Sequence, residues 1–165
     1  MNKPLLLKHI LAELEIVHQS AVDAAQRAYE TATDDENTAE NKYDTLGLEA
    51  SYLAHGQSER VAECKADVMA FKKLQPLDFF SDTPVAIGAL VYIEDELGDE
   101  QIVFLSPVAG GLKIKFNNKE ITLITPSSPL GKALFTCFVD DEIEVAFFND
   151  NKPDNKKLYQ ITAIY

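Results

Sequence analysis

The first part of the chain carries apolar residues at alternating spacings of three and four. The series is Leu7, Ile10, Leu14, Val17, Ala21, Ala24 and Ala28. This spacing places one narrow apolar seam along one side of an α-helix, where a partner helix can cover it. Neither glycine nor proline occurs between Leu5 and Tyr29. The pattern therefore predicts one long helix.

A second apolar seam follows further along the chain, at Tyr43, Leu46, Ala50, Leu53, Val61, Cys64, Val68 and Phe71. We predict a second helix over residues 39–74. The step from Leu53 to Val61 is one residue longer than a heptad. It predicts a local irregularity near Gly47 or Gly56.

The polar residues 31–38 separate the two predicted helices. Asp, Asn and Thr favour turns and helix N-caps, so this stretch predicts a bend. Two long helices around a short bend predict an antiparallel coiled-coil hairpin with arms of about 45 Å. The same heptads also permit pairing between two chains.

After Gln75-Pro76 the apolar period changes to two, which is typical of β-strands. The predicted strands are Val85–Ile93, Gln101–Leu105, Leu112–Phe116, Glu120–Thr125, Glu142–Phe148 and Leu158–Tyr165. A short helix over residues 129–135 is predicted by Ser128 as N-cap and Pro129 at the first helical position. The predicted fold class is α+β, with a helical hairpin over residues 1–75, a linker over 76–84 and a small β domain over 85–165.

Composition excludes several classes of protein. The chain has 27 acidic and 15 basic side chains, a net charge of −12, and 46% hydrophobic residues. This is the mix of a soluble globular protein. Nucleic-acid affinity comes mainly from Lys and Arg, so we expect weak or no binding of free nucleic acid and favour a basic protein partner. No apolar run is long enough for a membrane span. The two cysteines, Cys64 and Cys137, lie far apart and predict reduced thiols in the cytoplasm.

Metal and phosphate chemistry find little support in the sequence. His9, His18 and His55 have no ligand spacing and are predicted to be exposed helix residues. The pair Gly110-Gly111 predicts a turn, because the glycine spacing of a phosphate-binding loop is missing.

Two segments carry a family resemblance. Residues 125–134 read TPSSPLGKAL and lead through an acidic turn into the alternating segment VDDEIEV at residues 139–145; residues 35–43 read DENTAENKY. The first segment resembles the C-terminal signature of the Gre transcript-cleavage factors of bacteria. The second is similar to the acidic tip of that family. The resemblance implies a helical hairpin followed by a small domain like that of FK506-binding proteins.

The resemblance also implies a function. Such factors dock their β domain on RNA polymerase beside its secondary channel, and the hairpin reaches toward the active site and the 3′ end of backtracked RNA. Tip carboxylates, here Asp35, Glu36 and Glu40, help to hold a magnesium ion shared with the polymerase and to position water. The factor is not an enzyme by itself and has no cofactor of its own. The polymerase-docking residues implied here are Ser128, Pro129, Leu130 and Lys132.

The tip departs from the family pattern, which leaves three hypotheses open. Alignment on Glu40 puts Asn37 where the family has an aspartate, and alignment on Tyr43 puts Ala39 where it has a glutamate. The chain can be a cleavage-stimulating factor in which the neighbouring acids compensate. It can be a polymerase-binding regulator that occupies the channel without cleavage. It can also be an unrelated adaptor that binds another basic protein.

Overall fold

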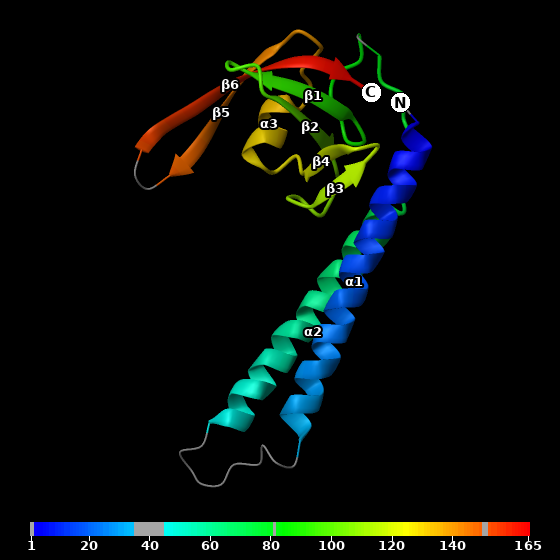
Figure 1. Ribbon diagram of the computed structural model, residues 1–165, viewed down its shortest axis with the longest axis vertical. Coiled ribbons are helices and arrows are strands. Elements are labelled where there is room, and N and C mark those ends of the chain that lie inside the picture. The colour runs from blue at the N-terminus through cyan, green and yellow to red at the C-terminus, as the bar shows by residue number, and fades with distance from the viewer. Residues whose placement is uncertain (1, 35–44, 81, 150–151) are drawn as a thin grey trace. The chain divides into compact units, whose positions relative to one another are not determined.

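The computed structural model describes residues 2–34, 45–80, 82–149 and 152–165 of the chain (Figure 1). The chain divides into two compact units. Leu11–Met69 forms one, and Met1–Ile10 together with Ala70–Tyr165 forms the other. We call them the hairpin unit and the β unit. The predicted division at residues 76–84 stays a prediction.

The hairpin unit contains most of α1 (Lys3–Thr33) and of α2 (Leu46–Phe71), two helices that lie side by side in opposite directions (Figure 1). On α1, Leu14, Ala21 and Ala28 are buried, and Val17 and Ala24 are half-buried. This is the seam that the sequence predicts for the first helix. Its residues shrink to alanine, which lets two helix axes approach closely.

The seam of α2 differs from the prediction. Leu53 is exposed, and one series of half-buried or buried positions runs along the helix: Gly47, Ala50, Ala54, Gln57, Val61, Cys64, Val68 and Phe71. This series alternates in threes and fours without a break, and α2 is continuous. The predicted irregularity is therefore wrong. Ala54 is half-buried and takes the seam position that the sequence pattern assigns to Leu53.

The C-terminal end of α2 also differs from the prediction. The helix ends at Phe71, before the predicted Leu74, because the N–H groups of Lys73 and Leu74 bond to carbonyls three residues earlier, at 3.2 and 2.9 Å. Such bonds tighten a helix end into a turn. The predicted part of this helix before residue 45 lies outside the described residues.

The β unit is built on one mixed sheet with the strand order β3-β4-β2-β1-β6-β5. The strands are β1 (Leu90–Asp95), β2 (Glu100–Leu105), β3 (Lys113–Phe116), β4 (Lys119–Ile124), β5 (Glu142–Asn149) and β6 (Lys152–Ile164). The pair β2–β4 is parallel and the other pairs are antiparallel. The first strand begins at Leu90, not at the predicted Val85, because a turn with Gly88 at φ +95° precedes it.

Both faces of the sheet are covered in part. On one face, α3 (Pro129–Leu134) inserts Leu134, fully buried, into a core that includes Val91, Ile93, Val103 and Ile161. The Phe71 and Phe104 rings meet at 6.2 Å between centroids. The fold class predicted from the sequence, a helical hairpin followed by a small β domain with one short helix, is confirmed.

The first turns of α1 belong to the β unit. The Lys3 ammonium is buried, donates to the Tyr165 carbonyl and lies 4.2 Å from the centroid of the Phe79 ring. His9 and His18 are half-buried rather than exposed as predicted, and the Nε2 of His9 lies 2.9 Å from the Lys115 carbonyl oxygen. The first turns of α1 thereby contact β3 and the residue that follows β6.

Candidate functional site

The entry to α3 has the local structure that the Ser-Pro pair predicts. Ser128 is the N-cap, and its Oγ accepts the N–H of Gly131 at 3.0 Å. The same hydroxyl donates to the Thr125 carbonyl at 2.8 Å. Pro129 occupies the first helical turn, where its missing N–H costs nothing. The Ser128 hydroxyl therefore donates its proton and accepts one N–H inside the fold.

Gly131 is a residue whose role the sequence did not indicate. A Cβ on Gly131 would lie 2.0 Å from the Thr125 carbonyl oxygen and 2.9 Å from the Ser128 hydroxyl. The helix approaches residue 125 so closely that only a hydrogen fits there. A glycine inside a helix shortly after a Ser-Pro cap is the signal that could have identified this contact.

A groove of about 540 Å³ runs beside this helix start. It is lined by the Gly110-Gly111 turn, the end of β4 and residues 125–130, apart from Pro126. Most of the implied docking residues, Ser128, Pro129 and Leu130, border this groove. Lys132 is exposed but is not part of its lining.

The polarity of the groove is mixed. The hydroxyls of Thr125 and Ser127 lie 2.9 Å apart at its rim. Leu130 is half-buried and also packs against the core of the β unit. The groove thus offers apolar surface with hydroxyl groups beside it, an arrangement suited to a protein segment.

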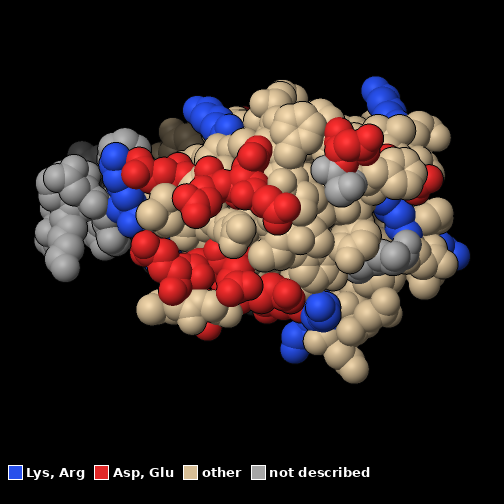
Figure 2. Space-filling view, turned by 90° about the horizontal axis from the view of Figure 1, so that it is seen from above, with Lys and Arg blue, Asp and Glu red and all other residues tan. Residues whose placement is uncertain are grey.

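The β unit also presents a negative surface. Figure 2 shows acidic side chains gathered in two neighbouring bands across one face. A hollow of about 180 Å³ between the β1–β2 turn and the β5–β6 pair is lined in part by Glu94, Asp95, Glu96 and Glu142. This distribution agrees with the expected preference for basic partners.

The tip residues Asp35, Glu36 and Glu40 lie outside the described residues. The residues that flank them are described. At the end of α1, the Thr33 hydroxyl donates to the Tyr29 carbonyl at 2.9 Å. At the start of α2, the Thr45 hydroxyl donates to Glu49 at 2.9 Å. Both helix ends are thus held by local side-chain bonds.

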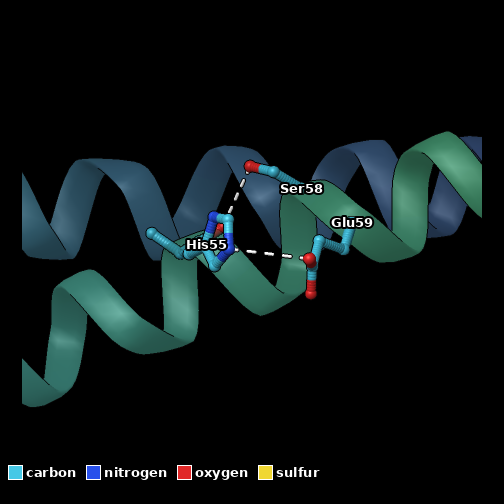
Figure 3. Close-up of polar contacts among 4 residues, drawn as sticks. His55, Ser58 and Glu59 are labelled. Carbon is cyan, nitrogen blue, oxygen red and sulfur yellow. Dashed lines mark hydrogen bonds and ion pairs between the residues drawn. The ribbon is translucent and has the colours of Figure 1, made fainter.

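Within the described ranges, no three His, Cys, Asp or Glu side chains are grouped so that they could hold a metal ion. The Nε2 of His55 lies 3.6 Å from the Oε1 of Glu59 on the exposed side of α2 (Figure 3). The hydroxyl of the neighbouring Ser58 donates to the Ala54 carbonyl at 2.9 Å. An exposed pair of this kind contributes about 0–1 kcal/mol. His55 is a surface residue, as the sequence predicts.

Comparisons with known proteins give the following result. No family model matches the chain, and no curated protein matches it. Among solved structures, it is similar to GreA factor homolog 1 (Gfh1) of Thermus thermophilus, with 22% identity, 96% of this chain and 92% of that chain covered, and a TM-score of 0.36. It is similar to Gfh1 of Thermus aquaticus with 20% identity, coverage of 93% and 92%, and a TM-score of 0.38.

The chain is also similar to a GreA/GreB elongation factor of Nitrosomonas europaea, with 16% identity, coverage of 71% and 91%, and a TM-score of 0.36. These structures come from the family that the two sequence motifs resemble. No helix in the described part of the chain is long and apolar enough to cross a membrane.

Proposed function

We propose that the chain is a cytoplasmic transcription factor that binds RNA polymerase beside its secondary channel and stimulates cleavage of backtracked RNA. The observation that carries this proposal is the acidic connection between two long helices. Asp34, Asp35, Glu36 and Glu40 fall in the sequence between α1, of 31 residues, and α2, of 26 residues. At 1.5 Å per residue, α1 is about 46 Å long, a suitable length for reaching into a narrow channel.

The proposed role of the tip is to supply ligands. Asp35, Glu36 and Glu40 would hold a magnesium ion shared with the polymerase, because carboxylate oxygens are hard donors that suit this ion. When bound, the ion activates water for phosphoryl hydrolysis. The chain contributes carboxylates and the polymerase contributes the rest of the active site. In this proposal the chain stimulates a nuclease without being an enzyme itself.

The β unit would supply the docking contact. The groove beside Ser128, Pro129 and Leu130 offers apolar surface with hydroxyl groups at its rim, and the exposed Lys132 lies on the same helix. The net charge of −12 favours a basic protein surface over free nucleic acid. Contact with RNA is then limited to the 3′ end inside the complex.

A second candidate function rests on the tip sequence. Depending on the alignment, Asn37 or Ala39 replaces one of the two acidic residues of the family pattern. With one ligand missing, the hairpin would occupy the channel and alter initiation or pausing without any cleavage.

The deciding experiment follows the length of end-labelled RNA in a stalled, backtracked elongation complex after purified protein and magnesium are added. Shortening is expected with the native chain and is expected to disappear with the Glu36→Gln/Glu40→Gln variant, which should still bind. The matched control is Glu59→Gln/Glu63→Gln, which removes the same charge from exposed positions on α2. The control should cleave like the native chain.

Other results point elsewhere. Binding without shortening supports the regulator that occupies the channel. Normal cleavage by the Glu36→Gln/Glu40→Gln variant contradicts the tip assignment. Failure to bind the polymerase contradicts both functions and leaves the unrelated adaptor.

A further inference from the structure

The C-terminal end of α3 exposes two aromatic rings. Phe135 is 44% exposed and Phe138 is 41% exposed, directly after the helix that anchors Leu134 in the core. Phe135 is the C-cap of α3, whereas the groove lies beside Ser128 at the N-cap. Large apolar side chains held at the surface are a common feature of protein interaction sites.

The residue between the two rings has a strained backbone. Thr136 has φ +69°, a left-handed conformation that is unfavourable for a β-branched residue. Main-chain hydrogen bonds hold it there: Thr136 donates to the Val85 carbonyl at 2.9 Å, and Val85 donates to the Cys137 carbonyl at 2.8 Å. Strain that is fixed by its surroundings in this way is concentrated at functional sites.

Acidic groups border the same segment. Asp140 and Asp141 are exposed, and Asp141 accepts the N–H of Phe138 at 2.7 Å. Burial, and then the charge of Asp141, raise the pKa of the Cys137 thiol. This thiol is therefore protonated at neutral pH and is no nucleophile. The segment presents two rings, a negative edge and no reactive group.

We propose that Phe135, Phe138, Asp140 and Asp141 form a docking surface for a basic amphipathic helix of a protein partner. Apolar side chains one helical turn apart on the partner would cover the two rings. Lysine or arginine beside them would face the two carboxylates, and the net charge of −12 would attract such a partner from a distance. The surface is separate from the groove beside Ser128 and from the hairpin tip, and it does not depend on the function proposed for them.

The test uses the full chain with fluorinated phenylalanine placed at residue 135 or 138 and observed by ¹⁹F NMR. The probe is a model helix of about four turns built from leucine and lysine, and a leucine–glutamate helix of the same pattern is its negative control. The lysine helix is expected to shift both resonances to saturation. The glutamate helix is expected to shift neither.

Variants locate the surface. The Phe135→Ser/Phe138→Ser variant is expected to weaken binding about tenfold, as loss of central aromatic residues does at protein interfaces. The matched control is Leu97→Ser, because Leu97 is 86% exposed on the acidic β1–β2 turn. This control should bind like the native chain.

Three results would overturn the proposal: unshifted resonances, equal binding of the glutamate helix, or a loss with Leu97→Ser as large as with the double variant. If the double variant fails to fold, the Asp140→Asn/Asp141→Asn variant decides. Its amide oxygen can still accept the Phe138 N–H, so the local fold is kept. Binding of the lysine helix should fall several-fold, and unchanged binding would contradict the charge complementarity.

Discussion

Replacing Gly131 with alanine is the sharpest perturbation of the site at α3. The added Cβ would lie 2.0 Å from the Thr125 carbonyl oxygen, which is backbone and cannot rotate away. The helix start must move, and that movement breaks the bonds between Ser128 and its two backbone partners, Thr125 and Gly131. Overpacking costs about 1–3 kcal/mol and loss of an N-cap costs about 0.5–2 kcal/mol. We expect a loss of about 2–4 kcal/mol in the free energy of unfolding.

The measurement is thermal unfolding followed by circular dichroism, and the expected fall in Tm is about 5–15 °C. Gly56→Ala is the matched control, because Gly56 is also helical but a Cβ there meets nothing within 4 Å. In an exposed helix, this change should raise stability by about 0.5–1 kcal/mol. If Gly131→Ala unfolds within 1 °C of the native chain, the steric argument is refuted, since a carbonyl at 2.0 Å leaves no room for relaxation without cost.

Three further predictions concern other parts of the chain. Thr136→Gly should raise the unfolding free energy by about 1 kcal/mol in urea titrations, because glycine adopts φ +69° without strain; a decrease would contradict the strain argument. Burial lowers the pKa of Lys3 from 10.5 to about 8, and the charge of Asp78 partly opposes this shift. The unfolded chain therefore binds more protons than the folded one between pH 8 and 10.5, and the native protein should gain stability relative to Lys3→Met as the pH rises through this range. A constant difference in unfolding free energy between the two proteins over this range would refute the burial argument. Ala54→Leu should cost about 1–3 kcal/mol by overpacking the hairpin seam, whereas Leu53→Gln, at an exposed position, should change the unfolding free energy by less than about 0.5 kcal/mol; equal effects would contradict the seam.

The long elements were predictable because their apolar periods are strong. The first helix and the cap of α3 follow from local rules, namely the heptad spacing and a Ser-Pro pair. The seam of α2 was not predictable in this way. Hydrophobicity favours Leu53 over Ala54, whereas a close contact between helices favours the smaller side chain. Sequence patterns weigh apolar character, but packing at a close helix contact depends on volume.

Contacts between distant segments explain the remaining differences. His9 is half-buried because the start of the chain packs on residues far along the sequence, and the carbonyl of Lys115 is its neighbour. Val85 lies outside the sheet because its backbone bonds to Thr136 and Cys137. The clash that makes Gly131 necessary depends on a carbonyl six residues earlier. None of these partners leaves a periodic signal in the sequence.

A comparison of stability with binding tests whether the residues at the two ends of α3 bind partners or only stabilise the fold. A helix of six residues is too short to be stable alone and depends on Leu134 and its caps. If α3 and the segment after it only stabilised the fold, binding should fall only in variants that lose stability. Asp140→Asn/Asp141→Asn should instead weaken binding of the leucine–lysine helix at nearly unchanged stability, because an amide oxygen can still accept the Phe138 N–H while the charge is lost. Gly131→Ala should lower stability together with polymerase binding. A loss of binding without a loss of stability in Asp140→Asn/Asp141→Asn is thus the result that a structural role alone cannot produce.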